Sequence, residues 1–244
     1  MMKLYEADNH ILIHAGDMEP SEHRHMAAHI MVSLHGTMRV TADGVETCCR
    51  GVMIPSGISH VVDACGGAVL AFLYDAATAV AEQIRELRFL ADGDCGAIAA
   101  WYAALERDVT ADHYGQFERA CLACLGIRNT GGRILDERIR WAVEYIRRGS
   151  SGKLTCREVA DAVCLSQSRF SHLFKEQVGM TFASYLIYQR ILAAYMEILE
   201  GKSVTEAALN AGFSSSGHLA DVNRRVFGLA VSSVTRDMVF WKVR

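Results

Sequence analysis

The sequence predicts an α+β protein in which an N-terminal β-barrel or sandwich is followed by helices only. Three observations predict this order. Short apolar or alternating runs, separated by turns such as Asp43-Gly44, fill residues 4–75, a pattern typical of strands. From residue 76 onward, apolar residues recur at helical spacing instead. Both prolines of the chain, Pro20 and Pro55, precede that change, so the helices that follow are uninterrupted.

The same patterns predict the individual elements and the domain boundaries. The predicted strands are Leu4-Tyr5, His10–His14, Ile30–Leu34, Met38–Thr41, Val52–Ile54, Val61-Val62 and Val69–Tyr74. The predicted helices outside the two motifs described below are Ala77–Leu90, Ala97–Leu105, Tyr114–Leu125, Ile134–Arg148 and a last short helix, Ser232–Trp241. Asn129-Thr130-Gly131-Gly132 is typical of a linker. We therefore expect a barrel domain (1–75), a helical segment (76–130) and an all-α domain (133–244).

The charge of the chain is divided unevenly between its two halves. Residues 133–244 carry 16 Lys and Arg against 11 Asp and Glu, a net charge of +5. Residues 1–132 carry 9 and 17, a net charge of −8, so the whole chain has a net charge of −3. A basic half beside an acidic half favours one nucleic-acid-binding module and one module of another kind.

The sequence predicts neither a membrane segment nor an export signal. Its apolar runs are shorter than the roughly 18 residues that a membrane span needs. Polar and charged residues interrupt the first ten positions, MMKLYEADNH, unlike a signal peptide. The eight cysteines are scattered, without the spacing of a small disulfide framework. These features predict a cytoplasmic protein with reduced thiols and no membrane partner.

The segment Leu154–Gly179 predicts two short helices joined by a tight turn. Thr155 can cap the first helix, with Glu158 as its capping-box partner, and Ser166 can cap the second. One face of the second helix is apolar, and the other carries side chains that can reach base edges and phosphates in a major groove. These candidate DNA contacts are Gln167, Ser168, Arg169, Ser171, His172 and Lys175. An αα-hairpin of any helical protein can show the same pattern, so this segment alone leaves both interpretations open.

A second copy of the pattern favours the DNA-binding interpretation. Ser203–Gly228 repeats the cap, the turn and the closing glycine. Its candidate DNA contacts are Ser215, Ser216, Gly217, Asp221, Arg224 and Arg225. One long predicted helix, Thr181–Leu199, joins the two copies. Two helix-turn-helix units on a rigid connector would place their second helices in successive segments of the major groove.

This arrangement resembles the AraC/XylS family of bacterial transcription regulators over about Ile134–Arg236. The resemblance is carried by Leu154–Tyr185, by Arg190 and Ala194 on the connector, and by Ser203–Gly228. Two positions depart from the family pattern. Asn223 stands where the family usually has an aromatic residue, and Ala230-Val231-Ser232 stands where Ser-Pro usually follows the closing glycine. The resemblance implies double-stranded DNA as a partner, an N-terminal sensor domain, dimer contacts from the helices of residues 76–130 and, for an activator, RNA polymerase.

Four histidines of the predicted barrel form a candidate metal site. His23, His25 and His29 share parity, so on one continuous strand they would face the same side. His60 follows the turn Pro55-Ser56-Gly57. This spacing resembles the two motifs of cupin barrels, with His29 where that family usually has Glu. The resemblance implies that the four side chains hold one divalent transition metal, and imidazole suits Zn, Ni, Cu or Fe. The same histidines could instead line a polar ligand pocket or lie on the surface.

Together these observations predict a one-component transcription regulator rather than an enzyme. A cupin-like sensor domain would receive a small-molecule or metal effector, and a homodimer would bind DNA through its helix-turn-helix units. The alternative is a metal-dependent cupin enzyme fused to a helix-turn-helix tail. The four histidines favour that alternative, whereas the sequence offers no further general base or substrate clamp beside them.

Overall fold

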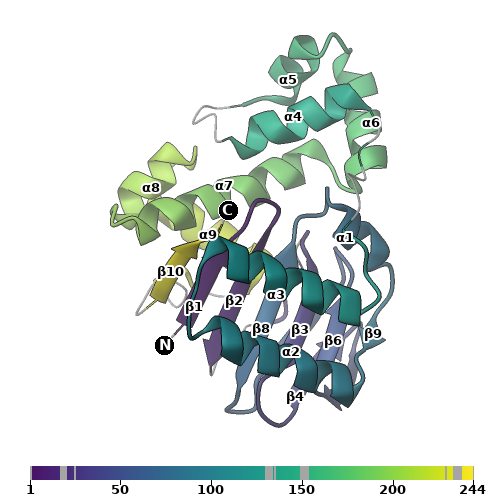
Figure 1. The fold of residues 1–244 in the computed structure, drawn as a ribbon. Coiled ribbons are helices and arrows are strands. Elements are labelled where there is room, and N and C mark those ends of the chain that lie inside the picture. Colours follow the sequence, from purple (N-terminus) through teal and green to yellow (C-terminus); the bar gives the residue numbers. More distant parts are fainter. Residues whose placement is uncertain are drawn as a thin grey trace. The chain divides into compact units, whose positions relative to one another are not determined.

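The computed structural model describes residues 2–16, 21–24, 26–129, 134, 136–148, 154–228, 230–232 and 238–243 (Figure 1). Its contacts divide the chain into two units. We call residues 1–131 with 236–244 the sheet unit, and residues 132–235 the helical unit. The predicted α+β class is confirmed, because strands dominate the N-terminal part and helices the C-terminal part. The expected DNA-binding domain 133–244 differs from this division at its end, where residues 238–243 pack with the sheet unit.

A seven-stranded sheet, here called the large sheet, forms the centre of the sheet unit, in the order β10-β1-β2-β8-β3-β6-β9. Its strands are β1 (Met2–Glu6), β2 (His10–Gly16), β3 (Ala28–Ser33), β6 (Gly51–Ile54), β8 (Ala68–Tyr74), β9 (Arg88–Phe89) and β10 (Met238–Lys242). Neighbouring strands are antiparallel except β1 and β10, which are parallel. β8 lies between β2 and β3, so residues far apart in the sequence meet at the centre of the sheet.

A three-stranded sheet, here called the small sheet, packs against one face of the large sheet. Its order is β5-β4-β7, formed by Val45–Cys49, Met38–Ala42 and His60–Asp63 respectively. Met38, Val40 and Val62 of the small sheet join Val52, Ile54 and Val69 of the large sheet in one buried cluster. Alternating apolar residues on both sheets produce this shared core. The predicted barrel or sandwich is therefore built from two facing sheets.

Helices cover the opposite face of the large sheet (Figure 1). They are α2 (Asp92–Leu105) and α3 (Ala111–Cys124), preceded by the short α1 (Ala79–Gln83). Tyr102 and Phe117 of these helices share a core with Phe72 of β8. The predicted helix Ala77–Leu90 is wrong beyond Gln83, because the chain extends there into β9, which pairs with β6.

The helical unit contains α4 (Glu137–Arg147), α5 (Cys156–Ala162), α6 (Gln167–Val178), α7 (Phe182–Leu199), α8 (Val204–Asn210) and α9 (Ser216–Phe227). Each of these helices starts at a side chain that accepts a hydrogen bond from a backbone N–H of its first turn, which is the preferred way to satisfy a helix start. The caps are Asp136, Thr155, Ser166, Thr181, Ser203 and Ser215. α7 contacts both helix pairs, α5–α6 through α6 and α8–α9 through both helices. In the described part of the chain, no helix combines the length and the apolar character that crossing a bilayer requires.

The predicted C-terminal helix, Ser232–Trp241, is wrong from Met238 onward, because residues Met238–Lys242 are a strand. These residues form β10, which pairs with β1 from Met2↔Met238 to Glu6↔Lys242. Its Val, Phe and Trp side chains suit a half-buried pleated surface. The Trp241 ring stacks on the Tyr5 ring with centroids 4.8 Å apart and planes 8° from parallel. Pairing with a distant strand thus overrides the local helical pattern.

Candidate nucleic-acid interface and candidate effector site

Helix α6 is fixed at both ends by its own sequence. The Ser166 hydroxyl accepts a hydrogen bond from the backbone N–H of Arg169 at 3.3 Å. At the other end Gly179 adopts φ 86°, and its N–H donates to the Lys175 carbonyl at 2.9 Å. Phe170 and Phe174 are fully buried, so the apolar side of α6 packs inward and its polar side faces solvent.

The predicted DNA contacts on α6 lie on that solvent-facing side. Gln167, Ser168, Arg169, His172 and Lys175 are exposed. Ser171 is half-buried, and its Oγ lies 3.3 Å from Cys156 Sγ on α5. Ser171 therefore lies at the edge of the face, against the first helix of the pair. The other five side chains form a continuous surface that could enter a major groove.

Helix α9 repeats α6 position by position. Both span twelve residues, begin at a serine cap and end at a left-handed glycine. Adding 49 to an α6 number gives the α9 counterpart: Ser166 corresponds to Ser215, and Gly179 to Gly228. By the same step Lys175 corresponds to Arg224, and both are exposed. The two helices thus present a basic residue at the same position.

The predicted contacts on α9 are less uniform than those on α6. Asp221, the counterpart of His172, is exposed, as are Gly217, Arg224 and Arg225. The Ser215 hydroxyl already accepts a hydrogen bond from the His218 N–H at 3.1 Å, so one of its two acceptor positions is used within the helix. Ser216 is half-buried, and its Oγ accepts from Thr205 Oγ1 at 3.4 Å. The second reading face is therefore smaller, and it carries a negative charge.

Sequence reasoning missed one candidate contact, His218. It is exposed and is the α9 counterpart of Arg169, because 169 plus 49 is 218. Its Nδ1 lies 3.0 Å from Ser214 Oγ and 3.4 Å from Ser214 N, which donates to it. Nδ1 is therefore an acceptor, and the proton of the neutral ring is on Nε2. Aligning the two copies residue by residue would have identified it.

The turns of the two helix pairs also correspond, at Cys164 and Gly212. Both have a left-handed backbone, with φ of 56° and 86°. Arg190 of α7 packs over the second turn, since a Cβ added at Gly212 would lie 3.2 Å from its Nε. Burial lowers the pKa of this guanidinium. The first turn makes the same left-handed bend with a cysteine, which costs more than with glycine.

The histidines of the sheet unit come together in part. The His60 ring lies 4.5 Å from that of His23 and 4.9 Å from that of His29, measured between centroids. The backbones of His23 and His60 form an antiparallel bridge, with hydrogen bonds of 3.2 and 2.9 Å. His29 lies on β3 and is buried. Three of the four predicted ligands are therefore neighbours, and His25 lies outside the described residues.

Two of these imidazoles have the protonation that a metal ligand needs. His23 Nδ1 lies 2.8 Å from the Ser21 carbonyl, and His60 Nδ1 lies 2.9 Å from the Ile58 carbonyl. A carbonyl can only accept, so Nδ1 carries the proton and Nε2 the lone pair. Burial lowers the pKa of His60 to about 4 and also lowers that of His23, so both rings are neutral at pH 7. Among the described residues, however, no three His, Cys, Asp or Glu side chains converge as a metal site.

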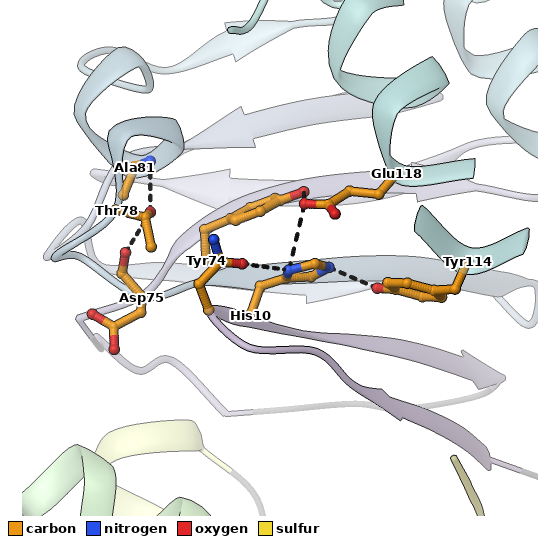
Figure 2. Close-up of polar contacts among 8 residues, drawn as sticks. His10, Tyr74, Asp75, Thr78, Ala81, Tyr114 and Glu118 are labelled. Carbon is orange, nitrogen blue, oxygen red and sulfur yellow. Dashed lines mark hydrogen bonds and ion pairs between the residues drawn. The ribbon is translucent and has the colours of Figure 1, made fainter. Parts of the chain in front are cut away.

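A separate polar network lies between the large sheet and α3 (Figure 2). His10 Nε2 lies 2.6 Å from Tyr114 Oη, and His10 Nδ1 lies 3.0 Å from Asn9 Oδ1. The Tyr74 hydroxyl donates to Glu118 Oε1 at 3.1 Å, and that oxygen lies 3.6 Å from His10 Nδ1. Burial lowers the pKa of His10 to about 3 and raises the pKa of Glu118. These contacts join α3 to β2 and β8 and satisfy the buried polar groups.

Comparison with known proteins finds a domain family and several relatives that match part of this chain. Residues 159–237 match a helix-turn-helix domain family. The chain is 32% identical to a probable transcriptional regulator, LumQ, of Photobacterium leiognathi over 87 residues, 35% of each chain. It is 31% identical to the arabinose operon regulatory protein of Escherichia coli over 100 residues, 40% of this chain and 34% of that one. The match thus spans about a third of the length of these relatives.

Solved structures extend the likeness to the whole fold. Apo ToxT of Vibrio cholerae has a TM-score of 0.66 and 10% identity, over 95% of this chain and 98% of that one. ToxT bound to an unsaturated fatty acid has a TM-score of 0.58 and 11% identity, over 94% and 95%. At these identities the likeness shows the fold alone.

The sheet unit and the paired helices define this chain as a protein with tandem helix-turn-helix units joined to a sheet domain. Over the matched part the chain is similar to AraC-type regulators such as the arabinose operon regulatory protein. This similarity agrees with the resemblance inferred from the sequence.

Proposed function

We propose that this chain is a cytoplasmic transcription regulator that binds double-stranded DNA through its helical unit and an effector through its sheet unit. The observation that carries the proposal is the pair of matched helices, α6 and α9. Both have equal length and the same caps, and both turn a polar face to solvent. The relatives are transcription regulators by name. The helix-turn-helix family match covers residues 159–237, where these features lie.

The connector supports simultaneous engagement of two groove segments. α7 has 18 residues, which at a rise of 1.5 Å per residue gives about 27 Å. Successive major-groove segments on one side of DNA are about 34 Å apart, so α7 is of suitable length to separate two reading helices. The face of α6 is richer in base-reading groups than that of α9. We therefore expect α6 to provide most of the sequence specificity.

Binding of the full-length protein to duplexes selected from a randomised pool tests this function. Lys175→Ala and Arg224→Ala should each reduce the slope of log affinity against log salt by about one, because each removes one phosphate contact. Lys202→Ala is the matched control, since Lys202 follows α7 and pairs with Glu197 at 3.1 Å. Failure to enrich any sequence would contradict the proposal. So would equal salt slopes in all four proteins.

For the effector we infer two alternatives in the sheet unit. A divalent transition metal, Zn, Ni, Cu or Fe, would be held by His23, His29 and His60 with His25. The neutral imidazoles of His23 and His60 favour it, although the described residues alone do not complete a ligand set. An organic effector is the other alternative. It is supported by the structure of ToxT bound to an unsaturated fatty acid, which has the same fold.

Metal analysis of the purified full-length protein separates these alternatives. If a metal is bound, His23→Ala combined with His60→Ala should abolish its retention and leave DNA binding of the helical unit measurable. His35→Ala serves as the control because His35 is exposed. Stoichiometric metal in the double variant would exclude these ligands. Wild-type protein that stays metal-free after supplementation would leave the organic effector.

We further propose that the protein acts as a homodimer, paired through helices of residues 76–130, with RNA polymerase as a partner if it activates. A dimer brings two α6 helices to one operator and so compensates for the weaker face of α9. Sedimentation of the protein alone and on DNA measures this state. A monomer that protects both groove segments by itself would contradict the dependence on dimerisation.

A further inference from the structure

We propose that strand β10 is a releasable strap whose docking on β1 is coupled to DNA binding by the helical unit. The inference rests on the function proposed above and adds a regulatory contact to it. Its basis is the connectivity of the chain, which leaves the sheet unit after residue 131 and returns to it at residue 236. The helical unit is therefore tethered at both ends while β10 is docked, and at one end when β10 is released.

The first tether is the point where the chain leaves the sheet unit, and hydrogen bonds within that unit hold the residues just before it. The Gln83 side chain accepts a hydrogen bond from the Arg128 N–H at 3.0 Å and donates one to the Arg128 carbonyl at 2.7 Å. Leu125, which lies shortly before Arg128 in the chain, is also held, because its carbonyl accepts a hydrogen bond from Arg88 Nη2 at 2.9 Å. The chain thus departs from a defined position. Changes in the restraint on the helical unit must then come mainly from the second tether.

The second tether is strand β10, and it has the features of a strand that can detach. β10 is at the end of the strand order and pairs only with β1 in the described sheet. A parallel pair is slightly less stable per residue than an antiparallel one. All residues of Met238–Lys242 are half-buried or exposed, whereas five of the seven residues of the central strand β8 are buried. Segments with few buried contacts open locally at low free-energy cost.

Docking of β10 is also linked to the interior of the sheet unit. The Trp241 ring stacks on Tyr5 at 4.8 Å, and the Val243 N–H donates to the Glu6 carbonyl at 2.9 Å. Tyr5 is fully buried, and its hydroxyl lies 3.1 Å from that of Tyr102 on α2. A change in the sheet unit that moves Tyr5 therefore alters the surface on which Trp241 rests. Binding equilibria connected in this way influence each other reciprocally.

The test compares Trp241→Ala with Lys242→Ala in the full-length protein. Trp241→Ala removes the ring that rests on Tyr5, whereas Lys242 is an exposed neighbour on the same strand. Hydrogen exchange of residues 238–243 measures docking, and exchange of β8 reports whether the sheet itself stays intact. DNA affinity is measured on a duplex that the wild-type protein has selected from a randomised pool.

We expect several-fold faster exchange of residues 238–243 in Trp241→Ala, with β8 unchanged. Its DNA affinity should differ from wild type by at least about fivefold, the lower range of typical coupling. If Trp241→Ala strengthens DNA binding, DNA should make β10 of the wild type exchange faster. If Trp241→Ala weakens DNA binding, DNA should make it exchange more slowly. Lys242→Ala should match the wild type in all three measurements.

Unchanged exchange of β10 when the wild-type protein binds DNA would overturn the coupling, and this measurement needs no variant to fold. Wild-type DNA affinity in a Trp241→Ala protein with a loosened β10 would also overturn it. In both cases the wild type still binds DNA, so the proposed function stands. A wild-type protein that selects no duplex would instead contradict the proposed function, and the coupling with it.

Discussion

Tyr195 of α7 donates a hydrogen bond from its hydroxyl to Oδ1 of Asn223 in α9, at 2.7 Å, inside the helical unit. Asn223 is fully buried, and Tyr195 is 6% exposed. Burial raises the pKa of the Tyr195 hydroxyl. The family usually has an aromatic residue at the position of Asn223, the counterpart of Phe174 in α6. In this chain the connector supplies an aromatic ring, and α9 supplies the amide that satisfies its hydroxyl.

This pair predicts that restoring the family pattern destabilises the protein. Asn223→Phe should lower the free energy of unfolding by about 1–3 kcal/mol, because the larger ring must compete with Tyr195 for space. Tyr195→Phe should cost a similar amount, since a buried amide oxygen loses a donor. Combining Tyr195→Phe with Asn223→Leu should recover part of that loss. Urea unfolding of the four proteins measures these differences, and a stabilised Asn223→Phe would contradict the assignment.

The left-handed turns predict opposite effects for two substitutions. Cys164→Gly should raise the free energy of unfolding by a few tenths to about 1 kcal/mol, because glycine adopts positive φ without the Cβ conflict of an L side chain. Gly212→Ala should lower it by more than about 1 kcal/mol, since it adds a Cβ at positive φ and 3.2 Å from Arg190 Nε. Thermal unfolding checks both. A less stable Cys164→Gly would show that the thiol has a packing role at this turn.

The two reading helices predict unequal responses to alanine at corresponding positions. His172→Ala should weaken binding to the selected duplex by about 1–3 kcal/mol if it contacts a base, with little effect on a scrambled duplex. Asp221→Ala should leave binding unchanged or strengthen it, because its carboxylate repels phosphates. Fluorescence anisotropy on both duplexes measures the difference. Loss of affinity in Asp221→Ala would instead identify Asp221 as an acceptor for cytosine N4.

The buried His10 predicts a loss of stability in mild acid. Its pKa is lowered by burial to about 3 in the folded chain, against about 6.5 when unfolded. Between these values the unfolded chain binds a proton at His10 and the folded chain does not. The free energy of unfolding therefore falls as the pH drops through this window, by up to about 1.4 kcal/mol per pH unit.

Neighbouring groups modify that slope, so the test is a comparison of variants. His60, with a pKa lowered to about 4, adds to the fall. Glu118, with a raised pKa, opposes it at the acid end, because the folded state binds its proton first. His10→Gln should flatten the dependence between pH 7 and 5 in urea unfolding, whereas the exposed His35→Gln should not. Equal slopes in all three proteins would contradict a neutral buried His10.

Local patterns in the sequence were sufficient to predict the helices of the helical unit. Caps such as Thr155 and Ser166, and the closing Gly179 and Gly228, are contacts within a few residues, so the sequence displays them directly. Most of the strands were also predicted. The pairing of β10 with β1 could not be, because it depends on residues more than two hundred positions apart. β9 was missed for a related reason, since Arg88-Phe89 pairs with Met53 and Val52 rather than with the adjacent chain.

In the candidate sites too, local features could be predicted from the sequence and contacts between distant residues could not. Sequence spacing identified the exposed polar residues of α6, since a helix face follows from periodicity alone. It could not show that Tyr195 reaches Asn223, because that contact joins two different helices of the folded chain. The proximity of His23 to His60 arises from a bridge between separate segments, which the cupin-like spacing suggested and periodicity did not.

The pairing of β1 with β10 also sets an order of events during synthesis. β1 precedes the whole helical unit in the chain and β10 follows it. While the ribosome makes the helical unit, the β1 edge has no partner from β10, and exposed strand edges favour wrong pairing with other chains. The sheet can be completed only after the entire helical unit has emerged. Addition of β10 is thus a late step, by which time both helix-turn-helix pairs can already have folded.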